Sequence, residues 1–191
     1  REWGDGQAIA MATAREAELE DARRNSPEAV AARLALLASA TDRGRVESAL
    51  RDLTAPRKML DAVQELRRRL GTLPQATSSA QLRLYRVALG ARLEQQLHCE
   101  ASLDADATAA VREALTSLPA NQAGDLPLMD GNRLSESTGL EPGERLGRLK
   151  AWLHRIQIEQ DHAPVADVES ALADLDWQDG PSDDWPRVSW P

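Results

Sequence analysis

Three arginines and a tryptophan recur at helical spacing late in the 191-residue chain. Arg145, Arg148, Trp152 and Arg155 follow one another at i, i+3, i+7 and i+10, which places them on one side of a helix. A guanidinium group binds phosphate oxygens through paired N–H donors, and an indole ring can stack on an unpaired base. The stripe therefore predicts contact with sugar, phosphate or base. The alternative is that Trp152 closes the edge of the core and the arginines are solvated.

Two carboxylate patterns could carry metal or nucleotide chemistry, and both have a simpler explanation. Asp104-Ala105-Asp106 has the spacing of a two-metal carboxylate pair, but it stands where a helix begins, so we expect Asp104 to cap that helix. Glu20-Asp21-Ala22-Arg23-Arg24 is typical of a charged helix face. Hydrolase, zinc and phosphate-loop motifs are missing, so we expect no catalytic centre, metal site or cofactor within these residues.

The composition limits the cellular setting as well as the chemistry. Cys99 is the only cysteine, which excludes an intrachain disulfide and fits a reducing cytoplasm. No apolar run approaches the roughly 20 residues of a membrane-spanning helix. The N-terminus shows neither a signal-peptide pattern nor a starting Met, so we expect a cytoplasmic piece of a longer protein without a membrane partner. Its oligomeric state stays open.

Helix-forming residues dominate, and no sustained alternating run of β-branched or aromatic residues occurs. The sequence therefore predicts an all-α protein, an array of about nine helices with an extended C-terminal tail rich in Trp and Pro. We expect helices over the following approximate ranges: 7–24, 26–40, 45–53, 56–70, 79–98, 104–118, 130–137, 143–161 and 164–175. The expected parts are a helical body over 1–74, connecting helices over 75–125 and a tail-like part over 126–191.

Positive charge is concentrated between residues 43 and 92. This stretch holds eleven basic and four acidic residues, a local charge of +7 inside a chain whose total is −8. The basic residues are Arg43, Arg45, Arg51, Arg57, Lys58, Arg67, Arg68, Arg69, Arg83, Arg86 and Arg92. Such a block can present a positive face to a nucleic acid even in an acidic protein, or it can simply solvate a surface.

Small residues at set spacings mark the segment 126–159. Leu128-Met129 leads into Gly131-Asn132-Arg133-Leu134, and Pro142-Gly143 precedes Leu146-Gly147. In this combination the segment resembles the C-terminal region of bacterial class II CCA-adding tRNA nucleotidyltransferases and related poly(A) polymerases. A weaker similarity to the helical body of those enzymes covers residues 31–37 and the pair of helices in the 50s.

The resemblance implies a function in tRNA 3′-end processing. In that family a catalytic head with Gly-Ser and Asp-x-Asp holds Mg, a neck with Glu-Asp-x-x-Arg selects CTP or ATP, and the helical body and tail hold the tRNA. This chain lacks the head, and Glu20–Arg24 lacks the context of the neck, so we expect it to be inactive alone. Its partners would be tRNA or other RNA and the missing N-terminal catalytic domain.

The resemblance and the arginine stripe together define the candidate RNA-binding residues. They are Gly131, Asn132, Arg133, Gly143, Arg145, Arg148, Trp152 and Arg155. The N–H groups at the helix start after Pro142-Gly143 would suit a phosphate oxygen, and Gly147 would let another helix approach closely. The alternative function is a helical protein-interaction or scaffold module without an RNA role. Whether the parent enzyme adds CCA, CC, A or poly(A) lies outside this sequence.

Overall fold

The computed structural model describes residues 26–39 and 41–191. That part of the chain is helical and contains no strand, which confirms the predicted all-α fold, and its helices are close in number to the about nine expected. The helix expected at 7–24 and the Glu20–Arg24 pattern lie outside the described residues.

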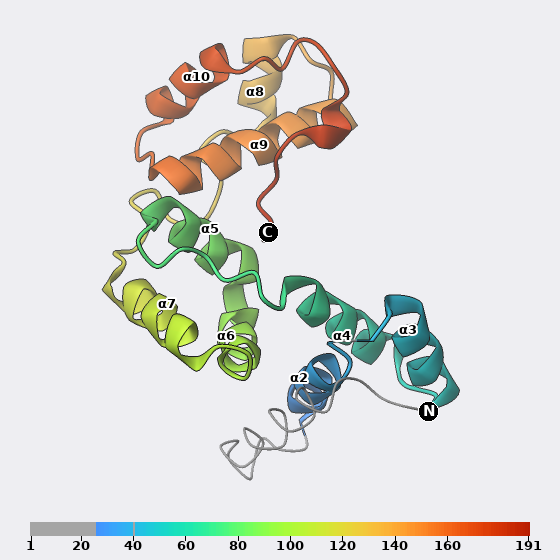
Figure 1. The fold of residues 1–191 in the computed structure, drawn as a ribbon. Coiled ribbons are helices and arrows are strands. Elements are labelled where there is room, and N and C mark those ends of the chain that lie inside the picture. The colour runs from blue at the N-terminus through green and yellow to red at the C-terminus, as the bar shows by residue number, and fades with distance from the viewer. Residues whose placement is uncertain (1–25, 40) are drawn as a thin grey trace. The chain divides into compact units, whose positions relative to one another are not determined.

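Most expected helices form within a few residues of their predicted limits (Figure 1). The helices are α2 (Pro27–Leu37), α3 (Arg43–Asp52), α4 (Arg57–Arg69), α5 (Ser79–Leu89), α6 (Leu93–Ala101), α7 (Ala105–Ser117), α8 (Gly131–Thr138), α9 (Glu144–Gln160) and α10 (Val165–Asp174), with 3₁₀ turns η1 (Gly90–Arg92) and η2 (Ser182–Asp184). Within the described residues, no helix is long and apolar enough to cross a membrane.

Several helix starts are fixed by side chains that accept backbone hydrogen bonds. The Ser26 hydroxyl accepts from the N–H of Ala29 at 3.1 Å, and the Asp42 carboxylate accepts from Arg45 at 3.2 Å. Asp104 accepts from the N–H of Ala107 at 2.9 Å, which confirms that the Asp-x-Asp pattern begins with a helix cap. Each contact satisfies a first-turn donor that the helix itself leaves unbonded.

The chain divides into two compact units that do not follow its sequence order. Unit 1 contains the described residues up to Leu73 together with Ala91–Arg112, and unit 2 contains Pro74–Gly90 with Glu113–Pro191. The middle part expected over 75–125 is therefore shared between the units, and α7 begins in one and ends in the other.

The predicted long helix over 79–98 is wrong, because the chain breaks at Gly90. Gly90 has φ +49° and ψ −124°, a conformation that L side chains avoid, and it ends α5 before η1 and α6 begin. A glycine in an otherwise apolar helical pattern was the available signal. The break coincides with the boundary between the two units.

Unit 1 is built on small side chains. Helix α2 packs against α4 and α6, and α3 packs against α4. The buried cluster contains Ala31, Ala32, Ala35, Leu36, Ala38, Val46, Leu50, Val63, Leu66 and Cys99. Alanines on α2 allow its neighbours to approach closely. Leu53 is 68% exposed because α3 ends at Asp52 and the chain turns at Thr54 with φ +52°.

Unit 2 is organised around α9, which contacts α5, α8, α10 and η2. Figure 1 shows α8 and α10 on one side of α9 and α5 on the other. The buried cluster contains Met129, Leu134, Leu146, Leu149, Leu153, Val168, Leu172 and Trp185. Trp185 comes from the C-terminal tail, so this tail contributes to the core.

Candidate nucleic-acid interface

Capping residues fix the ends of α8 and the beginning of α9. The Asp130 carboxylate accepts from the N–H of Arg133 at 2.9 Å, so α8 begins at Gly131. Gly139 ends α8 with φ +71°, a left-handed conformation typical of a helix C-terminus. Leu134 is fully buried on α8 and Leu146 is buried on α9, and the two helices pack together. The glycines of this segment thus mark the limits of two helices, α8 and α9, that pack together.

The first turn of α9 is open to solvent. Gly143 precedes the helix without a side-chain cap, and both Gly143 and Gly147 are exposed. A Cβ built on Gly147 would meet none of the described atoms within 4 Å. The close helix approach expected at Gly147 is therefore not made by any described part of this chain.

The other candidates on α8 lie at the surface. Asn132 is exposed, and Gly131 is partly exposed with open space beside it. Arg133 donates from Nε and Nη2 to one oxygen of Glu169 on α10, at 3.0 and 2.7 Å. This ion pair links α8 to α10, and at an exposed position it adds little stability.

Arg145 binds the chain's own C-terminal tail. Its guanidinium group donates to the carbonyl oxygens of Trp177, Gln178 and Gly180 at 2.8, 2.9 and 3.1 Å. The same group lies 5.0 Å from the centroid of the Trp185 ring. We call residues 177–191 the strap, because this segment lies along α9 and is held from several points.

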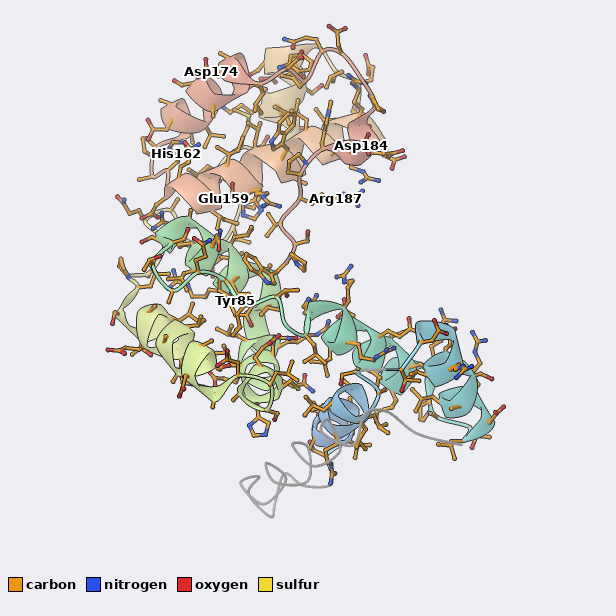
Figure 2. All side chains as sticks on the ribbon, viewed as in Figure 1. Tyr85, Glu159, His162, Asp174, Asp184 and Arg187 are labelled. Carbon is orange, nitrogen blue, oxygen red and sulfur yellow. The ribbon has the colours of Figure 1, made fainter. Side chains whose placement is uncertain are left out.

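Arg148 and Arg155 also contact the strap. Arg148 bridges Glu144 at 3.0 Å and Asp183 at 3.3 Å, and its side chain is 19% exposed. Arg155 pairs with Glu159 at 2.8 Å and donates to the carbonyl oxygen of Arg187 at 3.3 Å. Figure 2 labels Asp184, Arg187 and Glu159 along this course.

The aromatic rings of the strap rest on α9 and α5. Trp185 lies 5.6 Å from Trp152, with the two ring planes inclined by 39°. Trp190 meets Tyr85 of α5 edge to face, with ring centroids 5.2 Å apart. Trp152 itself is partly buried against the unit 2 core. The four residues of the predicted stripe thus lie on one face of α9, and the strap contacts each of them.

The basic block does not form one surface within one unit. Arg83 and Arg86 belong to unit 2, and the other nine residues belong to unit 1. Arg83 donates to the carbonyl oxygens of Ile158 and Glu159 at 3.0 and 2.9 Å, so it satisfies the C-terminal end of α9. Arg86 donates to the carbonyl oxygens of Leu118 and Pro119.

In unit 1, several basic side chains pair with acidic neighbours. Arg51 pairs with Glu47, Arg57 with Asp61 at 3.7 Å and Arg92 with Glu65. Arg45, Lys58 and Arg68 are exposed. The three ion pairs of Arg51, Arg57 and Arg92 reduce the local positive field, since each of these arginines has a carboxylate of opposite charge beside it.

Two polar residues that the sequence interpretation missed hold the end of α9. Gln157 is 2% exposed, and its amide accepts from the N–H of Leu128 and donates to the carbonyl oxygen of Leu126, both at 2.9 Å. The N–H of Gln122 donates to Asp161 at 2.9 Å; this bond is the main cause of the lowered pKa of Asp161, and Arg83 acts in the same direction. A glutamine in the apolar register of α9 was the available signal.

A pocket of about 300 Å³ lies between α9 and α10 and contains His162, Asp167 and Ser170. These residue types could suggest a hydrolase, but the Ser170 hydroxyl donates to the carbonyl oxygen of Ala166 at 3.0 Å. His162 Nδ1 lies 3.6 Å from Asp167. The serine hydroxyl thus bonds to its own helix instead of to an imidazole base. Among the described residues, no group of His, Cys, Asp and Glu could hold a metal ion.

Comparison with protein-family models, with curated proteins and with solved structures found no match to this chain. The interpretation of the site therefore rests on the residues and on their geometry.

Proposed function

We propose that this chain holds RNA, and tRNA in the first place, as the C-terminal region of a cytoplasmic tRNA nucleotidyltransferase or poly(A) polymerase. The resemblance of residues 126–159 to that family supports this proposal. Nucleotide transfer, with Mg and CTP or ATP, would belong to a catalytic domain that these 191 residues do not contain. The isolated chain would therefore bind RNA without extending it.

The open first turn of α9 is the observation that carries the proposal. The N–H groups at a helix start carry partial positive charge and suit a phosphate oxygen. Gly143 provides no capping side chain, and Gly147 leaves the end of the first turn without a side chain. Glycine inside a helix costs up to about 1 kcal/mol relative to alanine. A phosphate backbone that approaches this surface would account for a glycine at position 147 in spite of that cost.

Polar side chains lie beside this surface. Glu144 lies in the first turn of α9 and pairs with Arg148 at 3.0 Å. Asn132 is exposed on α8, which packs against α9, and its amide can both donate and accept hydrogen bonds. We infer contacts with sugar and phosphate that do not select particular bases.

The proposal is tested by tRNA binding to the intact chain over a range of salt concentrations. We expect micromolar binding at low salt that weakens steeply as salt rises, because phosphate contacts release counterions. Replacing Gly147→Gln should reduce the affinity about tenfold, since the new side chain would occupy the space that the RNA needs. Ala110→Gln on α7, at an exposed helical position, is the matched control and should bind as the parent does.

Two results would contradict the proposal. The first is an intact, folded chain that fails to bind tRNA even at low salt. The second is equal binding by the Gly147 and Ala110 variants, which would remove the first turn of α9 from the interface.

A second function is favoured by the strap. Arg145 of α9 donates to carbonyl oxygens of this extended, Trp- and Pro-containing segment, and the indole of its Trp185 is buried. Interaction modules bind extended peptides through the same kinds of contact. On this alternative the chain is a protein-interaction or scaffold module. A chain that binds no tRNA but binds a synthetic peptide of residues 177–191 after its own strap is removed would favour it.

A further inference from the structure

The strap lies on α9 in the way that a bound ligand would. Arg145, Arg148 and Arg155 each contact it, and their partners in the strap are backbone carbonyl oxygens or a carboxylate. These are oxygen acceptors of the same kind as a phosphate group, and the planar guanidinium fork suits both. The strap also carries Asp179, Asp183 and Asp184, so it brings negative charge to the stripe.

The stripe holds the indole of Trp185, a flat aromatic group comparable in size to a nucleic-acid base. It contacts Trp152 at 5.6 Å and the Arg145 guanidinium at 5.0 Å, and only 8% of the residue is exposed. Unpaired bases in RNA complexes also pack against aromatic side chains and arginine planes. Beyond Trp185, the carbonyl oxygen of Arg187 meets Arg155. An aromatic ring flanked on either side by oxygen acceptors reproduces the order of groups in a nucleotide chain.

We propose that the face of α9 formed by Arg145, Arg148, Trp152 and Arg155 binds a single-stranded RNA segment, and that the strap covers this face as an internal mimic of that segment. The inference deepens the proposed function and rests on it. It assigns the open first turn of α9 to the phosphate backbone of folded RNA and the covered face to an unpaired end. Single-stranded RNA must then displace the strap, so the intact chain binds it weakly.

The test removes the strap and measures binding of a labelled 12-nucleotide single-stranded RNA. Deleting residues 180–191 should increase the affinity at least tenfold. It should also steepen the salt dependence, by about 0.7 in the logarithmic slope for each phosphate newly contacted. Adding Arg145→Gln and Arg148→Gln to the deletion should return the affinity to that of the intact chain. Arg57→Gln on α4, an exposed arginine in an i,i+4 ion pair, is the control and should not.

A synthetic peptide of residues 177–191 tests whether the strap and the RNA share one surface. Added in excess, it should compete with RNA for the deletion variant. A milder variant, Asp183→Ala with Trp190→Ala, weakens the strap at two points and keeps Trp185 in the core. It should bind the oligonucleotide several-fold more tightly than the intact chain.

Inorganic polyphosphate separates base stacking from charge. In the deletion background, Trp152→Leu should weaken RNA binding several-fold and leave polyphosphate binding unchanged. Equal losses for the two polymers would overturn the assignment of Trp152 as a stacking surface.

The failures of the two proposals are distinguishable. If the intact chain binds tRNA but neither the deletion nor the milder variant gains affinity for the oligonucleotide, the strap is purely structural and this inference is overturned. If the intact chain does not bind tRNA while strap removal creates oligonucleotide binding, the tRNA proposal fails and the assignment of the covered face stands.

Discussion

At the scale of single residues, burial decides the properties of Glu100. This carboxylate is 2% exposed, and both of its oxygens accept from the N–H of Gly71 at 3.0 Å. The Gln96 amide donates to it at 2.9 Å. Desolvation by burial nevertheless raises its pKa, and the hydrogen bonds from Gly71 and Gln96 oppose that shift only in part. Through its hydrogen bonds with Gly71, Glu100 connects α6 to the turn that follows α4.

The raised pKa of Glu100 predicts how stability changes with pH. The folded protein binds this proton more tightly than the unfolded chain does, so the contribution of Glu100 is largest below its unfolded pKa. That contribution is lost as pH rises through the raised folded pKa. Glu100→Gln should remove this part of the pH dependence. Denaturant unfolding near pH 5 and pH 7.5 measures it, with Glu28→Gln, an exposed carboxylate, as the control; identical pH profiles for parent and Glu100→Gln would contradict the prediction.

At the scale of elements, two glycines have opposite roles although space is open around both. A Cβ at Gly90 or at Gly147 meets none of the described atoms within 4 Å. Gly90 has φ +49° and ends α5, whereas Gly147 lies inside α9 with helical geometry. The two glycines therefore differ only in backbone conformation. From the sequence alone, both were predicted to lie inside a helix.

Alanine substitution at the two glycines should change the free energy of unfolding in opposite directions. Gly90→Ala should lower the free energy of unfolding by roughly 1 to 2 kcal/mol, because alanine is strained at that backbone conformation. Gly147→Ala should raise it by up to about 1 kcal/mol, because alanine favours the helix. Thermal and denaturant unfolding of the two variants would check this, and a stabilised Gly90→Ala would show that the break between α5 and α6 is not required.

At the scale of the whole molecule, each unit has its own core and the strap belongs to one of them. Unit 1 packs around alanines of α2, and unit 2 packs around leucines of α9 together with Trp185. A segment near the C-terminus is thus as much a part of the unit 2 core as the helices are. A substitution in that core should therefore lower the stability of unit 2 before that of unit 1.

Trp185→Ala should therefore destabilise unit 2 selectively. Loss of a large buried aromatic side chain typically costs about 3 to 5 kcal/mol. Amide hydrogen exchange followed by mass spectrometry should show faster exchange in α8, α9 and α10 and little change in α2 and α4. Trp177→Ala, at the partly buried start of the strap, should have a smaller effect. Uniformly faster exchange in both units would show that they unfold together.

The sequence by itself was sufficient for the local structure. Ser26, Asp104 and Asp130 marked helix starts, because capping depends on atoms three residues apart in the chain. The apolar residues of α9 recur at helical spacing, and Leu146, Leu149 and Leu153 are buried. The same spacing placed Arg145, Arg148, Trp152 and Arg155 on one side of the helix, since helical periodicity is a local property.

Only the tertiary structure decided what those side chains contact. Arg145 meets carbonyl oxygens 32 to 35 residues away, and Arg83 meets the end of α9 more than 70 residues away. Such partners depend on how the chain returns on itself, which periodicity does not encode. The division into two units, with α6 in unit 1 and α5 in unit 2, coincides with the break at Gly90. Local spacing determines which face a residue occupies, and packing between distant segments determines what covers it.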